Sequence, residues 1–179
     1  CHMDRGLTDL LLSTRIDHYV LGDLRLVDKC ELAIRCGARS CAHLVLSGDC
    51  TLAIDSGETV SLEAGDYALV THGSLHRLRR GTSARHFATD LRTLPLADRV
   101  PICRHGEGLS KVRILTAVFG MERVRVQPDD SILPPLLVMR SATDRLTLSG
   151  DREPDRLDRL LSGGGGRAMG ASLMHMLFV

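Results

Sequence analysis

The strongest structural signal in the chain is Gly65-Asp66-Tyr67-Ala68-Leu69-Val70-Thr71-His72-Gly73-Ser74-Leu75-His76. A glycine–aspartate turn opens this stretch, a short apolar strand follows, and a His-Gly turn delivers a second histidine at a fixed distance. The earlier run Leu44-Val45-Leu46-Ser47-Gly48 is another apolar strand that ends in a turn. Together the two segments predict the core of a small β-barrel with a pocket in its mouth.

Other strand-like runs surround these two. Residues 30–36 alternate apolar and polar side chains, which is typical of a half-buried strand. Residues 37–40 are expected to form a four-residue hairpin loop that leads into a strand at 41–46. Further strands are expected at residues 19–22, 51–54, 59–62, 67–70, 76–78, 86–88, 111–119 and 124–126, and those at 51–54 and 59–62 are expected to form a hairpin through a turn at 55–58. Turn residues at spacings of about 8–12 indicate an all-β sandwich or barrel.

The two ends of the chain have a different pattern. The leucine spacing in residues 5–15 predicts a short amphipathic helix, and residues 155–161 and 167–179 predict two more, joined by the glycine run 163–166. Residues 1–3 resemble a cloning scar before a natural start at Met3. We therefore divide the chain into a barrel at 4–94, a further β segment at 95–150 that completes or flanks it, and a helical region at 151–179. The apolar last residues suggest a chain cut from a longer one.

Composition excludes several classes of function. A net charge of +1, with 25% charged residues of mixed sign, argues against a nucleic-acid-binding surface. No apolar run approaches the roughly 18 residues of a membrane span, and no signal-peptide pattern opens the chain, so we expect a cytoplasmic protein. The six cysteines form no C-x-x-C pair and are expected to be free thiols. No nucleophile elbow, P-loop or H-E-x-x-H motif supports catalysis.

Three residues could bind a metal ion. Strand alternation places Cys41 and His43 on the same face. With His76 they would offer two imidazoles and one thiolate to a divalent ion such as zinc. The alternative is a core histidine bonded to the backbone beside a cysteine that fills apolar space. The barrel-mouth residues expected to line a ligand pocket are His43, Tyr67, His76 and Cys41.

The hairpin expected at 37–40 would make Cys36 and Cys41 cross-strand neighbours and would place Ile34 opposite His43. Such a dithiol is either a redox switch or a pair of buried, inert thiols. A basic cluster is a solvated strand edge or an anion site, and its members are Arg77, Arg79, Arg80 and Arg85.

Residues 65–76 resemble the second motif of the cupins. Gly65, Gly73 and His76 match that motif, whereas Thr71 stands where the family has a proline. The closing histidine of the motif is a ligand in metal-binding cupins, so the resemblance carries that role to His76. The first cupin motif is represented only by its strand and turn at 44–48, because its H-x-H and glutamate are missing.

The order and spacing of residues 43–48, 62–70, 72–76, 112–120, 132–134 and 173–179 resemble the N-terminal regulatory domain of AraC-type transcription regulators. The resemblance implies a mainly β, cupin-like double-stranded β-helix barrel that binds a small-molecule effector and is not an enzyme. It also implies a homodimer formed through the C-terminal helix, DNA contact only through a helix-turn-helix domain outside this chain, and no membrane partner. No cofactor is expected beyond a divalent metal such as zinc.

Two other functions remain open at this point. One is a cupin metalloenzyme of the dioxygenase or isomerase type, which would need an open metal site. The other is a thiol or metal sensor that uses Cys36, Cys41, His43 and His76.

Overall fold

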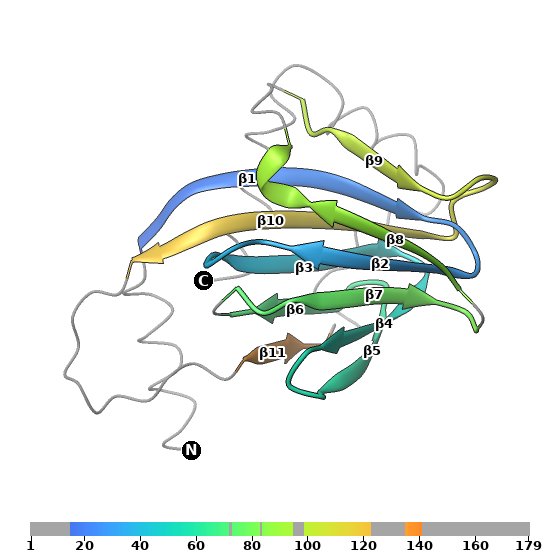
Figure 1. Cartoon of the computed structure of the whole chain (residues 1–179), viewed down its shortest axis with the longest axis horizontal. Helices are drawn as coiled ribbons and strands as arrows, with labels where there is room; N and C mark the ends of the chain where they lie inside the picture. The colour runs from blue at the N-terminus through green and yellow to red at the C-terminus, as the bar shows by residue number, and fades with distance from the viewer. Residues whose placement is uncertain (1–14, 72, 83, 95–98, 123–134, 141–179) are drawn as a thin grey trace.

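The computed structural model describes residues 15–71, 73–82, 84–94, 99–122 and 135–140. These residues form two facing β-sheets (Figure 1). In spatial order, the six-stranded sheet consists of β11 (Leu136–Met139), β6 (Tyr67–Val70), β3 (Ser40–Ser47), β10 (Val112–Glu122), β1 (Arg15–Leu26) and β9 (Ile102–His105). The five-stranded sheet consists of β5 (Thr59–Glu63), β4 (Asp49–Ile54), β7 (His76–Arg80), β2 (Cys30–Arg35) and β8 (Arg85–Asp90), which continues into the 3-10 helix η1 (Leu91–Thr93).

The six-stranded sheet depends on a strand from the second half of the chain. β10 pairs antiparallel with β1 on one edge and with β3 on the other, so it joins strands that are far away in sequence. β6 continues the sheet beyond β3, and β11 pairs with β6. Since each of these pairings is long-range, none is encoded in local periodicity alone.

The core lies between the two sheets and is built from alternating strand positions. In the five-stranded sheet, Leu32, Leu78 and Leu52 are register partners on three adjacent strands, and all three are fully buried. Opposite them, the six-stranded sheet contributes apolar side chains that include Leu24 and Ile114. Burying a leucine side chain contributes about 1.5–3 kcal/mol, so this layer is a large part of the stability of the fold.

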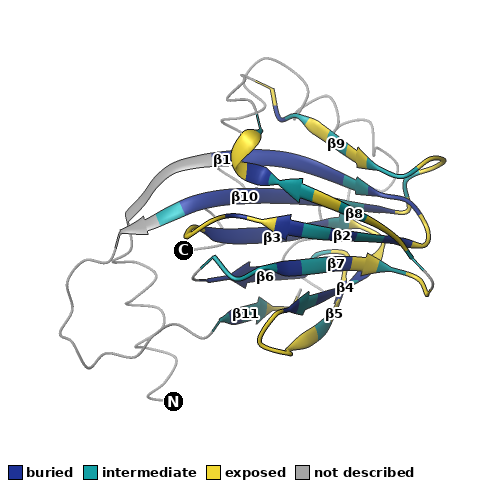
Figure 2. Ribbon diagram, in the orientation of Figure 1, coloured by how far each residue is buried: buried dark blue, intermediate teal, exposed yellow. Residues whose placement is uncertain are grey.

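The six-stranded sheet is apolar on both faces. A second buried cluster lies on the face turned away from the barrel interior, and it contains Leu21, Ala42, Leu44, Tyr67, Leu69, Val100, Leu115, Ala117 and Phe119. Figure 2 shows the consequence as dark strands β3 and β10, in contrast to exposed stretches on β5 and β8. A strand buried on both faces has a continuous apolar run, which is the pattern at residues 41–46.

Most of the predicted strands are confirmed, including the β4–β5 hairpin, and the mainly β fold class is confirmed with them. The predicted hairpin at 37–40 is wrong. Both edges of β2 are occupied, by β7 and by β8, so β3 cannot pair with β2 and joins the other sheet instead. Residues 37–40 therefore cross between the sheets. For the same reason Ile34 is the register partner of His76 and not of His43.

The helices predicted at 155–161 and 167–179 and the strand predicted at 124–126 lie outside the described residues. So does the helix predicted at 5–15, apart from Arg15, which begins β1. Among the described residues, no helix has the length and apolar character needed to cross a membrane.

Leu78→Ala should destabilise the protein by about 2–5 kcal/mol, because it leaves a cavity in the centre of the leucine layer. Urea denaturation followed by circular dichroism measures this change in the free energy of unfolding. Leu109→Ala is the control, since the Leu109 side chain is 82% exposed and its loss should change stability little. Equal effects of the two substitutions would contradict the core assigned here.

Candidate functional site

Four side chains with metal-binding and redox chemistry meet between the two sheets. Cys41 and His43 lie on β3 and point to the interior because they are two residues apart. His76 is the first residue of β7, and Cys36 follows the last residue of β2. Each of the four residues is at most 1% exposed.

The contacts within this interior cluster are short. The Nε2 atoms of His43 and His76 are 2.8 Å apart, and Nε2 of His43 is 3.4 Å from Sγ of Cys41. The two imidazole rings meet edge to face, with centroids 4.9 Å apart. The ligand atoms of Cys36, Cys41 and His76 all lie within 4.8 Å of one another. The cluster thus joins side chains of both sheets.

The hydrogen bonds define the tautomer of each histidine. Nδ1 of His76 is 2.9 Å from the carbonyl oxygen of Ser74, and a carbonyl only accepts, so this nitrogen carries the proton. Nε2 of His76 is then the acceptor for N–H of His43. Nδ1 of His43, 2.9 Å from Oγ1 of Thr116, accepts from that hydroxyl in turn. A directed chain runs from Thr116 through both imidazoles to the backbone of Ser74.

Burial keeps the two histidines and Cys41 neutral. Desolvation lowers the pKa of His43 well below its ordinary value, with a further contribution from His76, and desolvation also lowers the pKa of His76. The pKa of the Cys41 thiol is raised, first by burial and then by its hydrogen bond with Cys36. Neutral imidazoles and a protonated Cys41 thiol are therefore the resting forms near pH 7.

The turn before β7 holds the Ser74 carbonyl in place. Gly73 has a φ of +69°, and a Cβ atom at this residue would lie 1.8 Å from the carbonyl oxygen of Gly37. The crossing loop at 37–40 and the turn before His76 are thus packed backbone to backbone, which only glycine permits. This contact closes the barrel beside the interior cluster.

The structure brings together three of the four predicted pocket residues, namely Cys41, His43 and His76. Tyr67 lies elsewhere: its side chain belongs to the cluster on the outer face of the six-stranded sheet, with Leu44. Alternation on β6 carries the signal for this, since the neighbouring Ala68 points to the interior. Cys36 joins the cluster by way of the crossing loop rather than as a cross-strand neighbour of Cys41.

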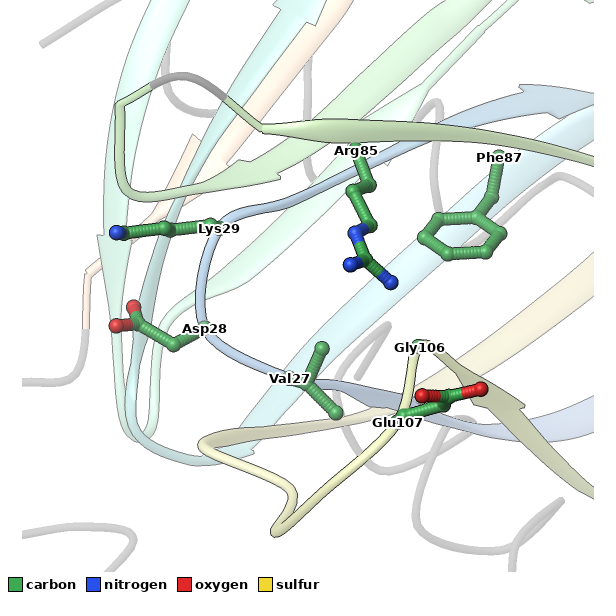
Figure 3. Close-up of a pocket in the computed structure, with 7 residues that line it drawn as sticks. All are labelled: Val27, Asp28, Lys29, Arg85, Phe87, Gly106 and Glu107. Atoms are coloured by element: carbon green, nitrogen blue, oxygen red, sulfur yellow. The ribbon is translucent and has the colours of Figure 1, made fainter.

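A second site lies at the rim of the barrel, and sequence patterns did not indicate it as a pocket. It is a cavity of about 310 Å³ lined by Val27, Asp28, Lys29, Arg85, Phe87, Gly106 and Glu107 (Figure 3). Three separate segments form it: the β1–β2 turn, the start of β8 and the β9–β10 turn. Among the lining residues, only Arg85 belongs to the basic cluster noted in the sequence. The cavity as a whole was not predicted, because a linear pattern does not show which turns lie close together in space.

Several polar side chains around the rim cavity lack an ion-pair or hydrogen-bond partner among the described residues. Within the described part of the chain, Arg85 and Lys29 make no side-chain ion pair, whereas Asp28 pairs with Arg80 at 3.8 Å. The ring centroid of His105 lies 6.0 Å from that of Phe87, a lining residue, and the buried Nε2 of His105 has no hydrogen-bond partner among the described residues. Polar groups of this kind beside a partly apolar wall are typical of a small-molecule site.

Thr116→Val should destabilise the protein by about 1–3 kcal/mol, since it keeps the shape of the side chain but leaves Nδ1 of buried His43 without its hydroxyl donor. Thermal and urea denaturation measure the change. Thr59→Val, at an exposed position of β5, is the matched control and should be close to neutral. If the two valine variants are equally stable, the directed hydrogen-bond chain is wrong.

Comparison with solved structures finds distant similarities. YhaK from Escherichia coli has a TM-score of 0.41 at 10% identity, over 73% of this chain and 44% of YhaK. Apo ToxT K231A from Vibrio cholerae has a TM-score of 0.39 at 10% identity, over 69% of this chain and 42% of ToxT. A cupin protein from Bacteroides fragilis has a TM-score of 0.32 at 13% identity, over 65% of this chain and 76% of that protein. The chain thus spans less than half the length of YhaK and of ToxT.

No curated protein matches the sequence. A family model described as Cupin matches residues 6–178, which is nearly the whole chain. Together with the two facing sheets, this match establishes that the chain belongs to the cupin family.

Proposed function

We propose that this chain is the effector-binding domain of an AraC-type transcription regulator and not an enzyme. The proposal rests on the cupin fold and on the resemblance of residues 43–48, 62–70 and 72–76 to those regulators. It includes a cytoplasmic location, self-association through residues 151–179, and DNA contact through a domain outside this chain.

The observation that carries the proposal is the contrast between the two sites. A metalloenzyme needs a coordination position that substrate can reach. The interior histidines are fully buried and bonded to each other, so no substrate reaches them in this conformation. The rim cavity is open and falls in the size range of small-molecule pockets, about 300–1,000 Å³. This contrast supports binding rather than catalysis.

The lining of the rim cavity indicates the class of effector. Arg85 and Lys29 supply positive charge, and Phe87 and Val27 supply apolar surface. Asp28 and Glu107 also line the cavity, and Asp28 pairs with Arg80. An arginine guanidinium binds a carboxylate through paired hydrogen bonds. We therefore expect a small carboxylate with an apolar body that packs on the Phe87 ring.

The position of the cavity suggests how binding is transmitted. Gly106 and Glu107 belong to the turn that leads into β10, the strand between β1 and β3. An effector that favours one conformation of this turn would shift the population of arrangements available to the attached regions. The β1–β2 turn also lines the cavity and is continuous with β1. An effector that favours one conformation of that turn would act on β1 in the same way.

Binding is tested by a thermal-shift screen of small aromatic and aliphatic carboxylates, with matched alcohols as uncharged counterparts. At least one carboxylate should raise the melting temperature of the wild-type chain, and Arg85→Ala should remove that shift because the guanidinium is lost. Arg39→Ala is the control, since Arg39 is exposed on the crossing loop, far from the cavity in the fold. A shift that survives Arg85→Ala, or the absence of any shift, would contradict the assigned effector site.

The regulatory role is tested with the full-length product of the native gene in a DNA mobility-shift assay. The carboxylate identified above should change the affinity for promoter DNA in the wild-type protein and leave it unchanged in Arg85→Ala, which should still bind DNA. A native reading frame without a DNA-binding domain would refute the regulatory role and leave the binding site intact.

A further inference from the structure

The interior cluster contains two thiols and two imidazoles within one small volume. Cys36 and His76 belong to the five-stranded-sheet side, and Cys41 and His43 belong to β3 of the six-stranded sheet. Two cysteines and two histidines are one of the ligand sets that bind structural zinc. The charge of the ion would be balanced by the two thiolates that form when zinc displaces the thiol protons.

The distances suit a tetrahedral ion after small side-chain shifts. Zinc–sulfur bonds of about 2.3 Å and zinc–nitrogen bonds of about 2.0–2.1 Å place tetrahedral ligand atoms about 3.3–3.8 Å apart. The Cys41 sulfur is 3.4 Å from Nε2 of His43, which falls within this range. The two Nε2 atoms, now 2.8 Å apart, would separate by about 0.5 Å to reach it. Cys36, Cys41 and His76 already converge to within 4.8 Å, and His43, which is not part of that group of three, reaches it through its contacts with Cys41 and His76.

The hydrogen bonds around the cluster fit ligation through both Nε2 atoms. The Ser74 carbonyl holds the proton of His76 on Nδ1, which leaves Nε2 available to a metal ion. His43 must move its proton to Nδ1 for its own Nε2 to bind. The Thr116 hydroxyl permits this change because it can accept from Nδ1–H as readily as it donates to a bare Nδ1.

The ligand set differs from that of metal-binding cupins. The next interior position on β3 after His43 is Val45, which packs in the apolar core, and β3 carries no glutamate. The H-x-H and carboxylate group expected for an open catalytic centre is therefore not formed on this strand. Thiolates from Cys36 and Cys41 replace it, and soft sulfur ligands favour zinc over magnesium, calcium or manganese.

The geometry points to a closed Cys2His2 zinc site formed by Cys36, Cys41, His43 and His76, which links the two sheets where residues 37–40 cross between them. All four coordination positions are filled by protein, and the site is sealed from solvent. Its role is structural, since no position remains for water or substrate. Zinc bound here stabilises the folded state because the unfolded chain offers no such site.

The test is metal analysis of the full chain, purified under reducing conditions after expression in zinc-supplemented medium. Wild-type protein should contain equimolar zinc by mass spectrometry of the metal, and removing the ion with a chelator should lower its melting temperature. Cys41→Ser and His76→Gln should lose the zinc. Cys30→Ser is the matched control, because Cys30 is equally buried but lies outside the cluster, and it should retain full occupancy.

Cobalt substitution makes the test independent of how the variants fold. Wild-type chain refolded with cobalt should show the thiolate charge-transfer band and the intense visible bands of a tetrahedral sulfur–nitrogen site, and adding zinc should remove both. One result would overturn the site: wild-type protein that contains no zinc and takes up no cobalt. That result does not bear on carboxylate binding at the rim cavity.

Discussion

Buried imidazoles must have their hydrogen bonds satisfied, and this constraint organises one end of the barrel. An unsatisfied buried polar group costs about 1–3 kcal/mol, and His43 and His76 together present four ring nitrogens to a region without water access. Each nitrogen has a partner: the two Nε2 atoms face each other, and Thr116 and Ser74 take the two Nδ1 atoms. The register of β10 against β3 and the backbone of the turn before β7 are both required for this arrangement.

The interior cluster and the rim cavity lie at opposite ends of β2. Lys29 lines the cavity immediately before this strand, and Cys36 joins the cluster immediately after it. Seven residues of extended chain span about 23 Å, so a rim-bound molecule does not touch the cluster. The buried cluster and the open cavity therefore lie at different ends of the fold. The chain keeps the motif histidine of the cupins at His76, whereas β3 carries no carboxylate.

Much of the fold could be predicted from the sequence, and the errors have a common physical origin. Alternation and turn residues identified the strands, the β4–β5 hairpin and the shared face of Cys41 and His43, because these depend on local geometry. The resemblance of residues 65–76 to the second cupin motif predicted that His76 lies in the same interior. The choice of strand partners is long-range, however, and the crossing at 37–40 became visible only once β7 and β8 occupied both edges of β2. Tyr67 was misplaced although alternation on β6 was available.

The rim cavity could not be predicted because three segments that are distant in sequence create it. The membership of Cys36 in the interior cluster could not be predicted either, because it depends on the crossing loop at 37–40.

The central claim is that His43 and His76 are neutral and form a directed pair, with the proton of His76 on Nδ1. Nitrogen-15 NMR of histidine side chains in the zinc-free chain at neutral pH tests it directly. We expect His76 to show a protonated Nδ1 and a bare Nε2, with His43 protonated on Nε2. An imidazolium at either residue, or a proton on Nε2 of His76, would contradict the account.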